Sequence, residues 1–175
     1  MHPTHWLICA QVPANASFET HRGRPLGHAF QCQRILDAVP GLRLTADPSH
    51  WHVVHERLLD MDAVAGRVDH IHCRIGNTQR PQLALPFSDV AADWHVAFWR
   101  KCWARRGSDV AGARTACVEY GPAPYQLTGD FRDLWLQNCA AKDHIEEAFA
   151  TWESDSFLSS ASFAEWEKEC FGELP

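Results

Sequence analysis

Four residues able to bind a metal ion stand at the ends of four predicted strands. They are Glu19, Asp47, Glu119 and either His72 or His70. The carboxyl ends of neighbouring parallel strands lie at one edge of a sheet, so we expect these side chains to converge. Three carboxylates and one imidazole form an oxygen-rich ligand set that suits Mn²⁺, Mg²⁺, Co²⁺ or Zn²⁺, and this set differs from the ligands of a thiolate zinc site. The pattern therefore predicts an oxygen-rich metal centre.

Each of these residues also has a structural alternative. Glu19 could form an ion pair with a nearby arginine, and Asp47 could cap the helix that follows it. His72 could be a hydrogen-bonded core histidine, and Glu119 could cap the helix beyond the next loop. Four such residues at four successive strand ends favour the metal site over four separate coincidences.

The elements that must position these residues alternate along the chain. Short runs rich in apolar residues are separated by segments with helical periodicity and by Gly or Pro breaks. Strands are predicted at 17–19, 42–46, 68–73 and 114–118, and helices at 27–38, 52–64, 90–106, 130–152 and 163–171. Repeated strand–helix order predicts an α/β fold with a parallel sheet and outer helices.

Aromatic residues mark the predicted core. Trp94, Phe98, Trp99 and Trp103 recur at helical spacing, which predicts a stripe that faces the sheet. Trp51, four residues after Asp47, either packs in the core or forms a wall of the predicted pocket.

Four segments resemble the sugar phosphate isomerase/epimerase family of xylose isomerase-like TIM barrels. They are Glu19-Thr-His-Arg-Gly-Arg24, Thr45-Ala-Asp-Pro-Ser-His-Trp51, His70-Ile-His-Cys-Arg-Ile-Gly76 with Pro81-Gln82, and Glu119-Tyr-Gly-Pro122. The resemblance covers residues 17–152. It implies a metal held by Glu19, Asp47, His72 and Glu119, with His70 in a supporting role.

The resemblance also implies a reaction. Glu19 and Glu119 would exchange protons with a sugar or sugar phosphate, and the metal would stabilise the ene-diolate left when the α-proton is removed. Two carboxylates on opposite sides of the substrate would allow 3-epimerisation, whereas one could shuttle a proton in an aldose–ketose isomerisation. His50, His21, Arg22 and Arg74 are the candidates for binding hydroxyls or a phosphate, and Arg24 and Arg80 are equally well placed.

The chain departs from that family in length, because a (β/α)8 barrel needs about 250 residues and this chain has 175. We therefore expect a partial (β/α)8 TIM barrel, with a poorly patterned segment at 1–15, a half-barrel at 16–155 and a helical extension at 156–175. Two open sheet edges and an apolar inner face would favour a homodimer, or a separate N-terminal half as partner.

Composition limits the function classes. A net charge of −6 provides no basic surface for nucleic acid, and no apolar run is long enough for a membrane helix. Seven scattered cysteines predict reduced thiols in a cytoplasmic protein. Two alternatives to the isomerase stay open: a non-catalytic half-barrel that binds metal or a partner, and a metal-dependent phosphodiesterase of the apurinic-site endonuclease type.

Overall fold

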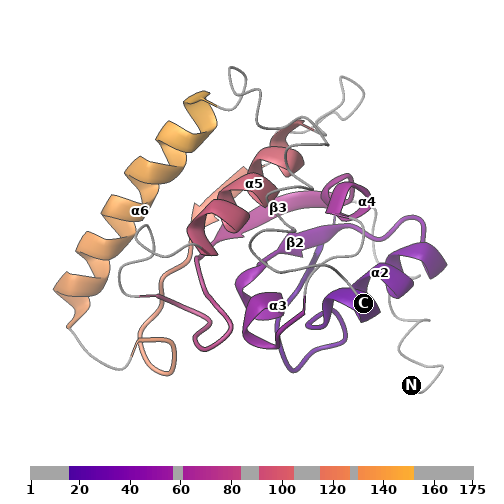
Figure 1. Cartoon of the computed structure of the whole chain (residues 1–175), viewed down its shortest axis with the longest axis horizontal. Helices are drawn as coiled ribbons and strands as arrows, with labels where there is room; N and C mark the ends of the chain where they lie inside the picture. The colour runs from indigo at the N-terminus through magenta and orange to yellow at the C-terminus, as the bar shows by residue number, and fades with distance from the viewer. Residues whose placement is uncertain (1–15, 57–60, 84–90, 105–114, 127–129, 152–175) are drawn as a thin grey trace.

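The computed structural model describes residues 16–56, 61–83, 91–104, 115–126 and 130–151, in which four strands alternate with helices (Figure 1). The elements are β1 (Phe18–Glu19), α2 (Ala29–Ala38), β2 (Leu44–Ala46), α3 (Ser49–Val53), α4 (Met61–Ala65), β3 (Val68–Cys73), α5 (Ala91–Ala104), β4 (Thr115–Val118) and α6 (Phe131–Thr151). The strands form one parallel sheet in the order β1-β2-β3-β4. The predicted α/β class and parallel sheet are confirmed.

The two faces of the sheet differ in chemistry. One face packs against the helices through Leu44, Ala46, Val68, Ile71 and Cys73, all at most 1% exposed. The opposite face, called the inner face here, consists of Glu19, Thr45, His70, His72, Thr115 and Cys117, which the strand register places side by side. The expectation of an apolar inner face is wrong. Successive residues of a strand point to opposite faces of the sheet, and here the apolar residues occupy the positions that face the helices.

A β-bulge in β3 produces this separation. Leu44 pairs with Val68 but the next residue, Thr45, pairs with His70, so Asp69 is an extra residue in β3. Arg43 holds Asp69 in place, with its Nη2 2.5 Å from Asp69 Oδ1. A bulge changes which face the following residues point to. It therefore lets Val68 and Ile71 share the buried face although they are three positions apart.

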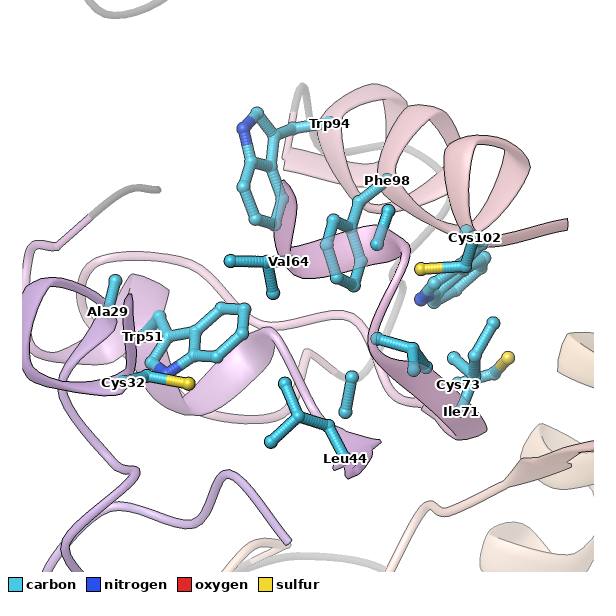
Figure 2. Close-up of a cluster of buried hydrophobic side chains, with 14 of the residues drawn as sticks. Ala29, Cys32, Leu44, Trp51, Val64, Ile71, Cys73, Trp94, Phe98 and Cys102 are labelled. Atoms are coloured by element: carbon cyan, nitrogen blue, oxygen red, sulfur yellow. The ribbon is translucent and has the colours of Figure 1, made fainter. Parts of the chain in front are cut away.

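Helices α2, α3, α4 and α5 supply most of the remaining core, and the loop residues Leu26, Leu42, Ile75 and Leu83 complete it (Figure 2). The predicted aromatic stripe of α5 is confirmed, because Trp94, Phe98 and Trp99 are fully buried and Trp103 is 6% exposed. Trp51 is also fully buried, and its Nε1 donates a hydrogen bond to Leu26 O at 3.0 Å. Trp51 is therefore a core residue rather than a pocket wall.

The single helix predicted at 52–64 is wrong. The helix-start signal at Asp47-Pro48-Ser49 agrees with α3, which begins at Ser49, but α3 ends at Val53 and a second helix, α4, begins at Met61. His55 has a left-handed backbone conformation with φ 59°, its N–H donates to His52 O, and the N–H of Glu56 donates to Trp51 O at 3.0 Å. These bonds form a Schellman-type helix end with histidine at the position that glycine usually takes.

Arg67, directly before β3, closes the end of the first strand–helix unit. Its guanidinium donates to Leu36 O at 3.4 Å, to Val39 O at 2.8 Å and to Leu42 O at 2.7 Å. These carbonyls belong to the last turn of α2 and to the turn that leads into β2. Helix ends leave such carbonyls without intrahelical partners, and Arg67 satisfies them.

The cysteines in the described part of the chain form no disulfide bonds. Cys32, Cys73 and Cys102 are buried, and Cys117 and Cys139 are half-buried. None of the described helices combines the length and the apolar character needed to span a bilayer. The expectations for residues 1–15, the extension at 156–175 and the helix at 163–171 fall outside the described residues.

Candidate metal centre

Three of the four predicted metal ligands converge in space. Glu19 ends β1, His72 lies in β3 and Glu119 directly follows β4. His72 Nδ1 lies 2.7 Å from Glu119 Oε2 and 3.4 Å from Glu19 Oε1. One ligand atom from each residue lies within 4.8 Å of the other two. We call these three residues the carboxylate–histidine cluster.

The electrostatics of the carboxylate–histidine cluster favour a positive charge at its centre. Burial lowers the pKa of His72, but the hydrogen bond and charge of Glu119 and the charges of Asp47 and Glu19 outweigh it and raise the pKa overall. Burial raises the pKa of Glu119, but His72 and Arg74 outweigh that effect and keep it below its usual value. An anionic pocket that stabilises a proton on His72 also fits a divalent cation held by one nitrogen and two carboxylates.

Asp47, the fourth predicted ligand, lies beside the cluster and is fully buried. Its Oδ1 accepts hydrogen bonds from Ser49 Oγ at 2.5 Å and from Ser49 N at 3.0 Å, and its Oδ2 pairs with Arg74 Nη2. Burial raises the pKa of Asp47 to about 6, although Arg74 and Ser49 lower it. The structure therefore places Asp47 in an ion pair rather than among the three converging ligand atoms.

Arg74 and His50, both predicted to bind substrate, lie beneath the surface. Arg74 is 2% exposed and His50 is fully buried. Arg74 Nη2 lies 2.9 Å from His50 Nε2 and 3.4 Å from Glu119 Oε2, so Arg74 links Asp47 to the cluster. Burial, followed by the charge of Arg74, lowers the pKa of His50 to about 2, so this ring is neutral and accepts a hydrogen bond from Arg74.

His21 and Arg22, the other two predicted substrate-binding residues, surround Tyr125. His21 Nε2 lies 2.8 Å from Tyr125 Oη, and the His21 and His50 ring centroids are 4.0 Å apart. Arg22 lies over the Tyr125 ring at 5.2 Å. Its Nη1 is buried and has no hydrogen-bond acceptor within the described part of the chain. Arg22 thus retains a donor that an anionic group could use.

Sequence reasoning missed three residues of this region. Ser49 holds Asp47, Tyr125 contacts His21 and lies 4.4 Å from Arg74, and Cys117 joins His70 and His72 in a second group of converging ligand atoms. The turn Asp47-Pro48-Ser49 could have indicated that Ser49 contacts Asp47. The polar loop that follows β4 could have indicated Tyr125 as a site residue. Strand alternation after the bulge was needed to place Cys117 beside the histidines.

Comparison with protein-family models, with curated proteins and with solved structures found no match for this chain. The resemblance to xylose isomerase-like barrels therefore stays a prediction. Function is inferred from the residues and the geometry of the site.

Proposed function

We propose that this chain is a divalent-metal-dependent isomerase or epimerase that acts on a sugar or sugar phosphate. The observation that supports it is the convergence of Glu19, His72 and Glu119 at the carboxyl ends of three parallel strands. These residues would hold Mn²⁺, Mg²⁺, Co²⁺ or Zn²⁺. When bound, such a metal would polarise a substrate carbonyl and stabilise the negative charge that develops as the α-proton leaves.

The two glutamates are the proposed proton carriers. The lowered pKa of Glu119 keeps it ionised near neutral pH, as a general base requires. Glu19 forms an ion pair with Arg24 at 2.6 Å, and Arg24 is more than half exposed, so this pair is weak and exchangeable. If each glutamate serves one face of the substrate, the product is an epimer. If one glutamate serves two adjacent carbons, the product is an isomer.

His21 and Arg22 are the proposed substrate contacts. The unpaired Nη1 of Arg22 could bind a phosphate or a hydroxyl oxygen. Tyr125 would orient His21 through its hydroxyl group and Arg22 through its ring. Arg74 and His50, being buried, would act through Asp47 and Glu119 by fixing their positions. Asp47 stays a predicted fourth ligand, and it would have to exchange its contact with Arg74 for the metal.

We further propose that the four strand–helix units form half of a (β/α)8 barrel. Strands β1 and β4 are the two edges of the sheet, and Thr115 and Ala116 of β4 are exposed. A second copy of the chain or a separate N-terminal half would pair with these edges and complete the substrate pocket.

The test begins with metal content. The purified wild-type chain is compared with Glu19→Gln, Glu119→Gln and, as a matched control, Glu146→Gln on the exposed face of α6. We expect near-stoichiometric metal in the wild type and the control, and weaker binding in the other two. The metal-loaded wild type is then incubated with ketoses and sugar phosphates in D₂O, and NMR follows exchange of the α-proton.

Two results would contradict the proposal. Absence of metal above background in a folded wild-type chain would remove the site. Bound metal without proton exchange, in the chain alone and in its oligomeric form, would favour the non-catalytic half-barrel.

A further inference from the structure

We propose that His70, His72 and Cys117 form a second metal site, a thiolate–imidazole site for Zn²⁺ on the inner face of the sheet. It goes beyond the proposed function, because it does not need the isomerase or epimerase reaction, and the only ligand that it shares with the carboxylate–histidine cluster is His72. One ligand atom of each of the three residues lies within 4.8 Å of the other two.

The strand register builds this group. His70 and His72 lie on the same face of β3, and Cys117 is the direct partner of His72 in β4. The two imidazole rings are 5.2 Å apart and nearly perpendicular, at 86°. The bulge at Asp69 places both histidines on the inner face, and Ile71 between them is buried on the helix-covered face.

A hydrogen bond holds Nδ1 of His70, and a short ion-pair contact occupies Nδ1 of His72. His70 Nδ1 lies 2.7 Å from Thr115 Oγ1, and His72 Nδ1 lies 2.7 Å from Glu119 Oε2. Histidines that bind metals usually use one ring nitrogen for the metal and the other for a carboxylate, carbonyl or hydroxyl. Nε2 of each ring is therefore the atom left for a metal, and Glu119 and Thr115 act as the supporting partners.

The donor set specifies the kind of metal. Two imidazole nitrogens and a thiolate sulfur match Zn²⁺, which prefers four-coordinate sites with nitrogen and sulfur ligands. Three protein ligands leave a fourth position for water or another small ligand. The carboxylate–histidine cluster instead offers His72 Nδ1 and oxygen ligands, so the two sites use opposite nitrogens of one ring.

Cobalt(II) replaces zinc as the spectroscopic probe, because a thiolate ligand gives Co²⁺ a sulfur-to-metal charge-transfer band that oxygen and nitrogen ligands do not give. The reduced wild-type chain is titrated with Co²⁺ beside Cys117→Ser, His70→Ala and Thr115→Val. The matched control is Cys139→Ser, which removes another half-buried thiol on α6.

We expect the band in the wild type and in Cys139→Ser, and its loss in Cys117→Ser. His70→Ala should weaken Co²⁺ binding more than Thr115→Val, whose loss of a supporting bond should cost about tenfold or more. Absence of the band at saturating Co²⁺, or an unchanged band in Cys117→Ser, would overturn the inference.

Glu19→Gln separates this inference from the proposed function. If Glu19→Gln loses metal and the wild type has no thiolate band, the carboxylate–histidine cluster stands and the second site does not. If the thiolate band persists in Glu19→Gln with full metal content, the second site stands and the proposed function fails.

Discussion

Replacing Arg74 by methionine should destabilise the protein strongly. Arg74 is 2% exposed and pairs with Asp47, which is fully buried. Methionine fills much of the same volume but leaves the Asp47 carboxylate without its cation. Breaking a buried ion pair from one side typically costs about 3–5 kcal/mol of unfolding free energy. The matched control is Arg24→Met, because Arg24 is 59% exposed and its pair with Glu19 should contribute less than about 1 kcal/mol.

The assay is urea unfolding of the wild type, Arg74→Met, Asp47→Asn and the double variant at pH 7. The two single losses should not add, because the double variant no longer contains an unpaired buried charge. We expect a coupling energy of about 2–3 kcal/mol, at the upper end for residues in direct contact. Metal should also stabilise Arg74→Met more than the wild type, because the Asp47 oxygen that Arg74 held becomes available as a ligand.

Additive losses, or a loss in Arg74→Met as small as that in Arg24→Met, would refute this reasoning. Either result would mean that water or another cation reaches Asp47, and that the carboxylate is not enclosed as described.

Two further predictions concern the core and the loop that carries His21. Burial, followed by the charge of His52, lowers the pKa of His95 well below 6.5. As the pH falls, His95 is therefore protonated in the unfolded chain before it is protonated in the folded protein. Below pH 6.5 this difference should lower the free energy of unfolding by up to about 1.4 kcal/mol per pH unit. Urea unfolding between pH 5 and 7 should show a flatter pH dependence in His95→Phe, and an unchanged slope would argue against a neutral buried ring. A Cβ on Gly27 would lie 2.3 Å from His21 O, whereas one on Gly41 would meet nothing within 4 Å; Gly27→Ala should lower the melting temperature and cost about 1–3 kcal/mol. Gly41→Ala is its control, and equal melting temperatures would contradict the close approach.

The sequence patterns were sufficient for the alternation of four strands with helices, although not for the division of the helix after β2 into α3 and α4. Strand β3 was predicted with its observed bounds, and the end of α2 at Ala38 was marked by the Pro40-Gly41 turn. The convergence of Glu19 and Glu119 with a histidine of β3 also followed from topology, because parallel strands bring their carboxyl ends together, whereas the choice of His72 over His70 came from the family resemblance. Features that depend on periodicity and connection order are therefore readable from one chain.

Local backbone geometry and pairing were not readable. His55 ends α3 in a conformation that sequence reasoning assigns to glycine or asparagine, so the break was invisible. The bulge at Asp69 depends on the partner strand, and no residue type marks it. The Arg74–Asp47 ion pair joins residues 27 positions apart, and only the folded structure shows that both are buried beside the carboxylate–histidine cluster.

The contacts of Arg67 have a consequence for the order in which the protein folds during synthesis. The carbonyls of Leu36 and Val39 at the end of α2, and that of Leu42 before β2, bond to a side chain that emerges from the ribosome 25 to 31 residues later. A nascent chain that stops before Arg67 therefore leaves α2 with a frayed carboxyl end, and its β1–α2–β2 segment lacks its closing bonds. The smallest cooperative unit of this protein should thus extend from β1 into β3.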